Sequence, residues 1–197
     1  MAVVFRPLTF ADLPCLAQLD FGYRSDAELA LERVHDGLVE ITWRLTLRPL
    51  DTPYDKGHGY DLKEEDLQAA HRRLEAGNCL EWVAEESSRV VGLLEVEPHE
   101  WRGAGWIWNI LIDRSFRRRG IGRQFIQRSM EWGRDRGLLA LVAETQAQNI
   151  QACRFYASMG FVAGGVDDRY YRYCPEPQAT REAALFWYLE LDDIEAD

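Results

Sequence analysis

The sequence has no long apolar run. None of its apolar stretches reaches the ~20 residues that a helical membrane span needs. The first residues, Met1 to Arg6, also lack a basic stretch followed by an apolar core and a small-residue cleavage site, so no export signal is visible. We therefore expect a cytoplasmic protein without a membrane partner.

The chain also lacks the residue spacings of a metal site. Its four cysteines and four histidines are scattered, without a Cys-x-x-Cys pair or a Cys/His spacing suited to zinc. We expect reduced thiols and no bound metal. The cysteines are Cys15, Cys79, Cys153 and Cys174, and the histidines are His35, His58, His71 and His99.

Positive charge is in short supply. Lys and Arg number 23 against 33 Asp and Glu, which gives a formal net charge of −10 and a pI of about 4.9. An acidic surface repels phosphate backbones, so we do not expect nucleic acid as a partner. The same surface attracts cations, which favours a cationic substrate.

Apolar residues are plentiful enough for one packed core. They make up 47% of a chain of 197 residues, which fits a single domain over residues 1–197. The oligomeric state stays open, with a homodimer among the options.

The first half predicts two helices and three strands. Thr9 and Asp12 have capping-box spacing, with Asp in the Glu/Gln position. Asp36-Gly37 predicts a hairpin turn, and Gly77 predicts the end of a helix. A turn-rich loop is expected over residues 49–60. The predicted elements are strand 3–6, helix 9–20, the hairpin arms 28–34 and 38–48, and helix 61–76.

The second half alternates strands and helices, which predicts an α/β fold. Its β-α-β-α-β order implies a mixed sheet packed by helices. The predicted strands are 80–86, 89–97, 105–113, 138–144, 161–173 and 182–191, and the predicted helices are 122–136 and 149–159.

The most informative segment is an arginine-glycine loop. The apolar strand Ile110-Leu111-Ile112 leads into Arg117-Arg118-Arg119-Gly120-Ile121-Gly122, where a helix opens. Free N–H groups at a helix N-terminus bind phosphate. Glycines without a Cβ let the backbone approach that ligand closely, and arginines add charge-assisted hydrogen bonds.

Three other interpretations of this loop fit less well. A dinucleotide loop needs a third glycine, where Arg123-Gln124-Phe125 follows instead. A Walker loop needs Gly-Lys-Ser/Thr, which is absent. A nucleic-acid patch would bring further basic residues, whereas the following helix has mixed charge.

The strand, loop and helix resemble motif A of the GNAT acetyltransferases, Gln/Arg-x-x-Gly-x-Gly/Ala. Residues 144–149 and 155–161 look like motif B of the same family. The resemblance implies an acetyl-CoA-dependent N-acetyltransferase with a mixed, mostly antiparallel central sheet and helices on both faces. It assigns acetyl-CoA binding to Ile110, Ile112, Arg117, Arg118, Arg119, Gly120, Gly122, Arg123, Asn149 and Tyr156.

A closer resemblance is to the streptothricin acetyltransferases. It is carried by Glu144-Thr145-Gln146, by Gly164-Gly165-Val166-Asp167 and by the terminal Ala184-Leu185-Phe186-Trp187-Tyr188. The expected acceptor is a primary amine on a small cationic compound of streptothricin or polyamine type. Trp108 and Asn109 depart from this pattern, because acidic residues stand there in that family.

Transfer to an amine needs a polarised thioester carbonyl, an acid for the leaving thiolate and a base for the amine. The resemblance gives the carbonyl to the backbone near Ile110–Ile112 and the acid to Tyr156. Glu144 and Glu97 are the candidate bases, with Glu95 on the same strand as Glu97. Residues that could line an acceptor pocket are Trp82, Trp101, Trp106 and Trp108.

Other classes stay open beside this hypothesis. The chain could be a protein lysine or N-terminal acetyltransferase. It could also be a catalytically silent CoA-binding sensor. A nucleic-acid module built on Arg117 to Arg119 is the remaining alternative, and salt-sensitive DNA binding would reveal it.

Overall fold

The computed structural model describes residues 2–37, 40–173 and 182–191. They divide into two compact units. The first unit comprises residues 2–22, 56–143 and 189–191, and the second comprises residues 23–37, 40–55, 144–173 and 182–188. The expectation of one domain over residues 1–197 stays a prediction.

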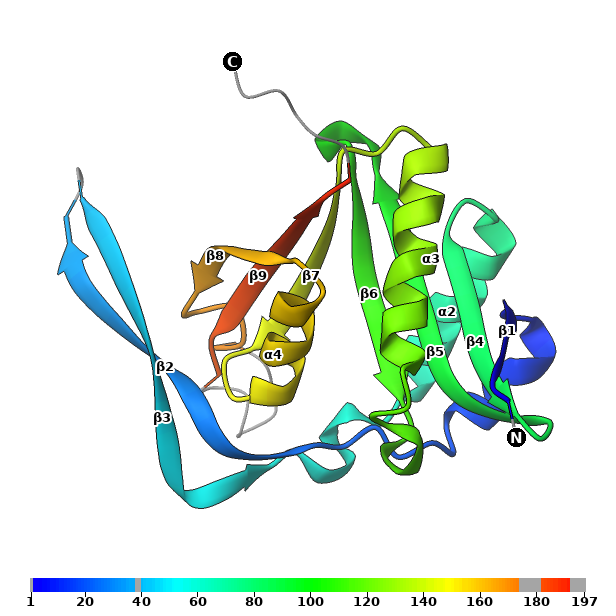
Figure 1. Cartoon of the computed structure of the whole chain (residues 1–197), viewed down its shortest axis with the longest axis horizontal. Coiled ribbons are helices and arrows are strands. Elements are labelled where there is room, and N and C mark those ends of the chain that lie inside the picture. Colours follow the sequence, from blue (N-terminus) through cyan, green and yellow to red (C-terminus); the bar gives the residue numbers. More distant parts are fainter. Residues whose placement is uncertain (1, 38–39, 174–181, 192–197) are drawn as a thin grey trace. The chain divides into compact units, whose positions relative to one another are not determined.

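The first unit is built on a twisted sheet (Figure 1). Its strands run in the order β1, β4, β5, β6, β7, with antiparallel pairs throughout except for the parallel pair of β6 with the first half of β7. The strands are β1 (Val4–Pro7), β4 (Leu80–Glu86), β5 (Arg89–His99), β6 (Ala104–Ile112) and β7 (Ala140–Gln146).

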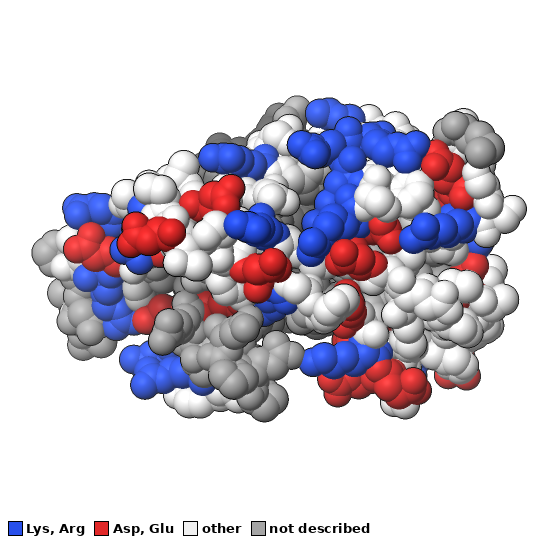
Figure 2. All heavy atoms as spheres, turned by 90° about the horizontal axis from the view of Figure 1, so that it is seen from below, with Lys and Arg blue, Asp and Glu red and all other residues white. Residues whose placement is uncertain are grey.

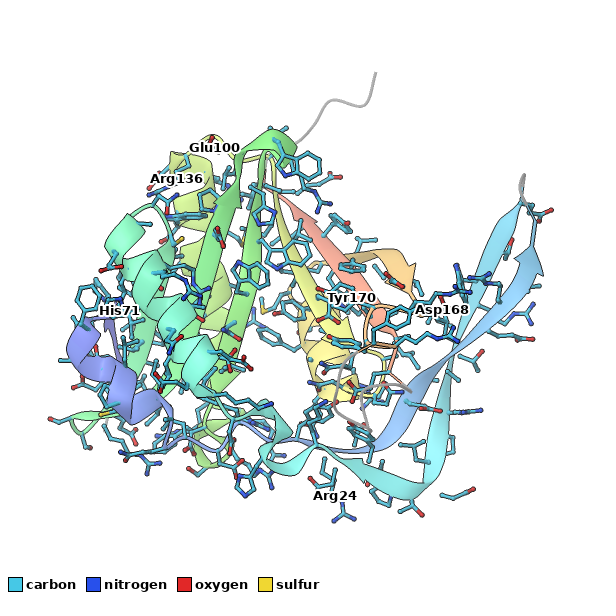
Figure 3. All side chains as sticks on the ribbon, turned by 180° about the vertical axis from the view of Figure 1, so that it is seen from behind. Arg24, His71, Glu100, Arg136, Asp168 and Tyr170 are labelled. Carbon is cyan, nitrogen blue, oxygen red and sulfur yellow. The ribbon has the colours of Figure 1, made fainter. Side chains whose placement is uncertain are left out.

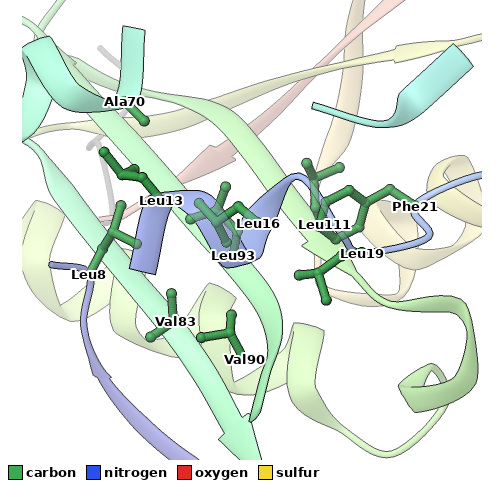
Figure 4. Close-up of a cluster of buried hydrophobic side chains, with 10 residues drawn as sticks. All are labelled: Leu8, Leu13, Leu16, Leu19, Phe21, Ala70, Val83, Val90, Leu93 and Leu111. Atoms are coloured by element: carbon green, nitrogen blue, oxygen red, sulfur yellow. The ribbon is translucent and has the colours of Figure 1, made fainter. Parts of the chain in front are cut away.

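Helices cover both faces of this sheet. One face carries α1 (Leu13–Leu16) and α2 (Glu64–Ala76) over an apolar cluster that includes Leu16, Val83 and Leu93 (Figure 4). On the other face Phe125 of α3 (Ile121–Asp135) lies 3.3 Å from where a Cβ on Gly92 would be. Successive residues of a strand point to opposite faces of the sheet. Gly92 therefore faces α3, and its neighbour Leu93 faces α1 and α2. The predicted α/β class and mixed sheet are confirmed.

One irregularity in this sheet bears on the site. Glu95 of β5 pairs with Asn109 of β6, but Val96 pairs with Ile107. Trp108 is therefore an extra residue, a β-bulge in β6.

The second unit combines a long ribbon with a smaller αβ piece. The ribbon pairs β2 (Arg24–Asp36) with β3 (Ile41–Asp55). The remainder is the end of β7, α4 (Ile150–Ser158), β8 (Val162–Asp167) and β9 (Ala184–Glu190), with β8 and β9 antiparallel.

Short 3₁₀ helices connect several of these elements. They are η1 (Phe10–Asp12), η2 (Gly57–Tyr60), η3 (Glu100–Arg102) and η4 (Arg114–Phe116). Gly77 ends α2 in a left-handed conformation, as predicted. No helix among the described residues is long and apolar enough to cross a membrane.

Several element predictions were wrong in extent. The first hairpin arm begins at Arg24, not near residue 28. The helix after Thr9 ends at Leu16, not near residue 20. The predicted loop 49–60 is mostly strand, because β3 continues to Asp55. Pro49 is tolerated there since each strand of a two-stranded ribbon has an unpaired edge. The predicted strand 161–173 ends at Asp167.

Some sequence predictions lie outside the described residues. These are the start of the second hairpin arm at residues 38–39 and the thiol of Cys174.

Candidate active site

The arginine-glycine loop starts from a buried anchor at Asp113, directly after β6. Its carboxylate accepts hydrogen bonds from the backbone N–H and the hydroxyl of Ser115, and from Arg89 Nη2 at 3.0 Å. The Asp113 N–H in turn donates to the Val91 carbonyl oxygen at 2.9 Å. These bonds fix the direction in which the chain leaves the sheet.

The loop then bends into α3 through two left-handed residues. Arg118 has φ +61 and Gly120, the N-cap of α3, has φ +82. A Cβ added at Gly120 would meet no atom within 4 Å, so the space in front of the helix N-terminus is open. The first N–H groups of a helix have no intrahelical acceptor and carry partial positive charge. This geometry fits a phosphate group such as those of acetyl-CoA.

Arg117 braces the loop from inside. Its Nε donates to the Ile112 carbonyl oxygen at 3.0 Å and its Nη2 to the Phe21 carbonyl oxygen at 2.8 Å. Burial lowers the pKa of this guanidinium from its usual value. The side chain thus joins the end of β6 to the segment before the ribbon.

The other arginines of the loop differ in what they contact. Arg119 forms an ion pair with Glu86, with Nη2 2.6 Å from Oε1, and packs over the Phe116 ring. Arg118 and Arg123 are exposed at the start of α3. Figure 2 shows basic side chains beside and between acidic ones on one face of the molecule.

A polar row crosses the sheet on the face that carries α2. Glu95 is 1% exposed, and its Oε1 lies 2.5 Å from Arg73 Nη2 of α2. Its Oε2 accepts a hydrogen bond from Asn109 Nδ2. Glu81, directly opposite Glu95 on β4, lies 3.7 Å from Arg73 Nε, and its Oε1 is buried without a hydrogen bond.

The protonation of Glu81 follows from this setting. Burial and the neighbouring Glu95 raise the pKa of the Glu81 carboxyl to about 7, while Arg73 opposes the shift. Glu81 therefore titrates near neutral pH. Neither Arg73 nor Glu81 was predicted from the sequence. For Glu81 the signal was a charged residue within the apolar strand β4, whereas Arg73 on α2 looks like any other charged residue of an amphipathic helix.

The four tryptophans that were predicted to line an acceptor pocket lie in different parts of the fold. Trp108 Nε1 donates to Glu97 Oε2 at 2.7 Å, and the Trp106 ring lies 5.8 Å from Trp108. Trp82 instead packs against Arg128 of α3, on the other face of the sheet. Trp101 is 85% exposed. Only Trp106 and Trp108 of the predicted four lie beside Glu97.

Asn149 and Tyr156 lie on α4 in the second unit. Asn149 is the N-cap of this helix, and its side chain accepts from the Ala152 N–H at 3.1 Å. Tyr156 is 7% exposed and packs edge-on against Phe155 and Phe161. Its ring therefore has a packing role whatever its hydroxyl does.

Glu144, a predicted base on β7, accepts a hydrogen bond from a tyrosine that was not predicted from the sequence. Tyr171 donates its hydroxyl proton to Glu144 Oε2 at 2.6 Å and accepts from Gln146 Nε2 at 3.1 Å. Tyr171 belongs to the segment after β8, together with Asp168 and Tyr170 (Figure 3). No spacing in the sequence links this segment to β7, because the contact depends on the tertiary fold.

The described residues hold no group of three His, Cys, Asp or Glu side chains arranged to bind a metal ion.

Comparison with known proteins identifies relatives over most of the chain. The model of the acetyltransferase (GNAT) family matches residues 42–161. Streptothricin acetyltransferase A of Bacillus subtilis (strain 168) is 25% identical over 169 residues, which cover 86% of this chain and 92% of that protein. Streptothricin acetyltransferase of Escherichia coli is 33% identical over 99 residues, half of this chain and 55% of that protein.

Solved structures share the fold. The crystal structure of nourseothricin acetyltransferase matches with a TM-score of 0.81 and 22% identity, covering 98% of this chain and all of that one. A protein of Bacillus anthracis named as a streptothricin acetyltransferase, solved with acetyl coenzyme A, matches with a TM-score of 0.76 and 24% identity. That match covers 96% of this chain and 99% of the other.

Proposed function

Since this chain belongs to the acetyltransferase (GNAT) family, and so is an acetyl-CoA-dependent N-acetyltransferase, we propose that its acceptor is a primary amine on a small cationic compound of streptothricin or polyamine type. The predicted resemblance to this family and to the streptothricin acetyltransferases is confirmed. The acceptor and the roles of individual residues are the parts that we propose.

The observation that carries the proposal is the length of the similarity to the Bacillus subtilis protein. It extends over 86% of this chain, well beyond the arginine-glycine loop. The net charge of −10 supports a cationic acceptor. Glu97 and the indoles of Trp106 and Trp108 add a carboxylate and two ring faces, both of which attract cations.

Acetyl-CoA supplies the acetyl thioester. We assign its phosphates to the N-terminus of α3, where Gly120 leaves open space and Arg118 and Arg123 add positive charge. Gly122, in the first turn of α3, is a further proposed backbone contact. Arg117 and Arg119 hold the loop in shape through Phe21 and Glu86. The backbone of Ile110 and Ile112 is the proposed contact for the pantetheine arm and the thioester carbonyl, and Asn149 is a further proposed cofactor contact.

Proton transfer completes the proposed chemistry. The attacking amine must be neutral, and we propose Glu97 or Glu144 as the group that takes its proton, directly or through water. Tyr156 is the proposed donor to the leaving thiolate. Its buried, packed ring would hold the hydroxyl in one orientation.

A thiol-release assay with acetyl-CoA tests the acceptor class. The panel should contain streptothricin, spermidine, lysine-containing peptides and peptides with free N-termini. We expect turnover with streptothricin or spermidine and little with peptides. Efficient acetylation of peptides alone would overturn the proposal. It would favour protein acetylation, the activity named for a Salmonella typhimurium relative, [ribosomal protein bS18]-alanine N-acetyltransferase, 32% identical over 79 residues.

A silent sensor is the remaining alternative. It would bind acetyl-CoA in calorimetry but release no thiol with any amine of the panel. Both an acetyltransferase and a silent sensor would bind acetyl-CoA. Thiol release with an amine therefore distinguishes between them.

A further inference from the structure

Three polar residues face each other across neighbouring strands. Glu81 of β4 pairs with Glu95 of β5, and Glu95 pairs with Asn109 of β6. Directly opposite residues of an antiparallel pair point to the same face. Val83, Leu93 and Leu111 lie two residues away on the same strands and belong to the apolar cluster under α1 and α2. The polar row thus continues that packed face.

Glu95 fixes the orientation of the Asn109 side chain. An ionised carboxylate only accepts hydrogen bonds, so the Asn109 amide must turn its NH₂ group toward it. The other Glu95 oxygen is held by Arg73, and the carboxylate is fully buried, so it cannot swing away. Asn109 itself is half-buried, and no described residue donates a hydrogen bond to its Oδ1.

We infer that Asn109 Oδ1 accepts a hydrogen bond from the acceptor amine and orients it for attack, with Glu95 and Arg73 as positioning residues. This inference rests on the proposed function. Asn109 directly precedes Ile110, whose backbone is the proposed contact of the thioester. An amine bound at Asn109 would therefore be one residue along β6 from its target.

A neutral oxygen suits this task chemically. A second carboxylate at position 109, in addition to that of the base, would further stabilise the ammonium form and raise the pKa of the amine, which would keep more of the nucleophile protonated. An amide oxygen accepts an N–H without that penalty. The buried side chain of Glu95 lies one side chain away from the amine, and it orients Asn109 instead of contacting the substrate.

Asn109→Ala is the direct test, with spermidine and streptothricin as probes in the thiol-release assay. Loss of the oxygen should raise KM for the amine and lower kcat/KM by about 10-fold or more, because one hydrogen bond to the amine is lost. KM for acetyl-CoA should stay unchanged. Gln127→Ala, which removes an exposed amide from α3, is the matched control and should change neither constant.

Glu95→Gln separates orientation from simple contact. The introduced glutamine can present either an oxygen or an NH₂ group to Asn109, so the amide of Asn109 loses its single orientation. The KM for the amine should rise although the substrate does not touch residue 95. In the double variant Asn109→Ala/Glu95→Gln, the second change should add nothing to the first.

If the wild-type protein acetylates neither probe, the proposed function fails. Direct binding measurements then still test the inference about Asn109. Calorimetry of both probes with the wild-type protein and with Asn109→Ala should then give affinities at least 10-fold apart for one of them. Equal affinity, or no binding to the wild type, would overturn the inference. So would an Asn109→Ala variant that turns over with wild-type KM, or one whose effect adds fully to that of Glu95→Gln.

Discussion

Arg117 Nη2 lies 2.8 Å from the carbonyl oxygen of Phe21, although 96 positions separate the two residues. The same guanidinium donates to Ile112 at the end of β6. A residue expected from its motif to bind the cofactor is thus bonded to the protein itself. Its contribution to cofactor affinity would be indirect, through the shape of the loop.

Arg117→Lys tests this bracing role. A lysine ammonium is a point charge and cannot reproduce the planar fork that spans two carbonyl groups. We expect a loss of about 1–2 kcal/mol in the free energy of unfolding and a weaker affinity for acetyl-CoA. Urea unfolding and calorimetry measure the two effects. Arg154→Lys on α4 is the control, and equal behaviour of the two variants would contradict the bracing role.

Gly120→Glu tests the loop as a phosphate site. A carboxylate in front of the α3 N-terminus would occupy the open space and repel phosphate, so acetyl-CoA binding should be lost in calorimetry. The left-handed φ adds strain of roughly 1 kcal/mol for any side chain. Gly77→Glu is matched, with φ +66 and no atom within 4 Å. It should lose similar stability but keep its affinity, and retained affinity in Gly120→Glu would exclude the site.

Tyr156→Phe tests the proposed acid. The ring contacts with Phe155 and Phe161 survive, so the fold should remain. Without the hydroxyl proton, turnover should fall by ~10²-fold or more while acetyl-CoA affinity holds. Tyr170→Phe, which keeps its ring against Phe186, is the control. If Tyr156→Phe keeps wild-type turnover, Tyr156 is not the acid and its role is packing only.

Glu144→Gln and Glu97→Gln identify the base. The variant that removes it should lose ~10²-fold in kcat/KM at neutral pH, and less at high pH where the free amine is abundant. Loss of an ordinary structural contact should lower activity equally at all pH values. The pH profile of kcat/KM therefore decides between the two carboxylates. Parallel profiles for both variants and the wild type would exclude both carboxylates as the base.

Glu81→Gln tests the titration of the buried cluster. The pKa of Glu81 is about 7 in the folded protein against 4.5 ordinarily, so the folded state binds this proton more tightly than the unfolded chain. The free energy of unfolding must then fall as pH rises from about 4.5 to 7. This loss amounts to about 1–3 kcal/mol. In Glu81→Gln the side chain is neutral at every pH, so this dependence of the unfolding free energy on pH is removed.

Urea unfolding at pH 5 and pH 8 measures this difference. The wild-type protein should lose stability between the two values, and Glu81→Gln should lose less and be the more stable at pH 8. Glu65→Gln, at an exposed position of α2, should follow the wild type. Identical slopes for wild type and Glu81→Gln would show that Glu81 titrates as an ordinary carboxyl.

Local signals in the sequence predicted most of the fold. Gly77 and Gly120 mark helix ends because few other residues adopt a left-handed backbone. Apolar alternation located β4, β5 and β6 to within two residues at each end. Pro49 misled the prediction of β3, because a proline forbids a central strand but not an edge.

The candidate site was predictable only where its parts are close in sequence. The loop and its glycines form one short motif. The partners of Arg117, Glu95 and Glu144 could not be predicted, because Phe21, Arg73 and Tyr171 reach them through tertiary packing. Contacts of that kind have no characteristic spacing by which a single sequence would show them.

The extra residue in β6 has a consequence for how this protein can change. Trp108 has no partner on β5, and the pairs on either side, Glu95 with Asn109 and Val96 with Ile107, are already in the order of an uninterrupted ladder. Deleting residue 108 would close the bulge without moving any other side chain to the opposite face. Length variation at this single position would therefore add or remove a large aromatic side chain beside Glu97, a proposed base, while the other residues of β6 kept their faces of the sheet.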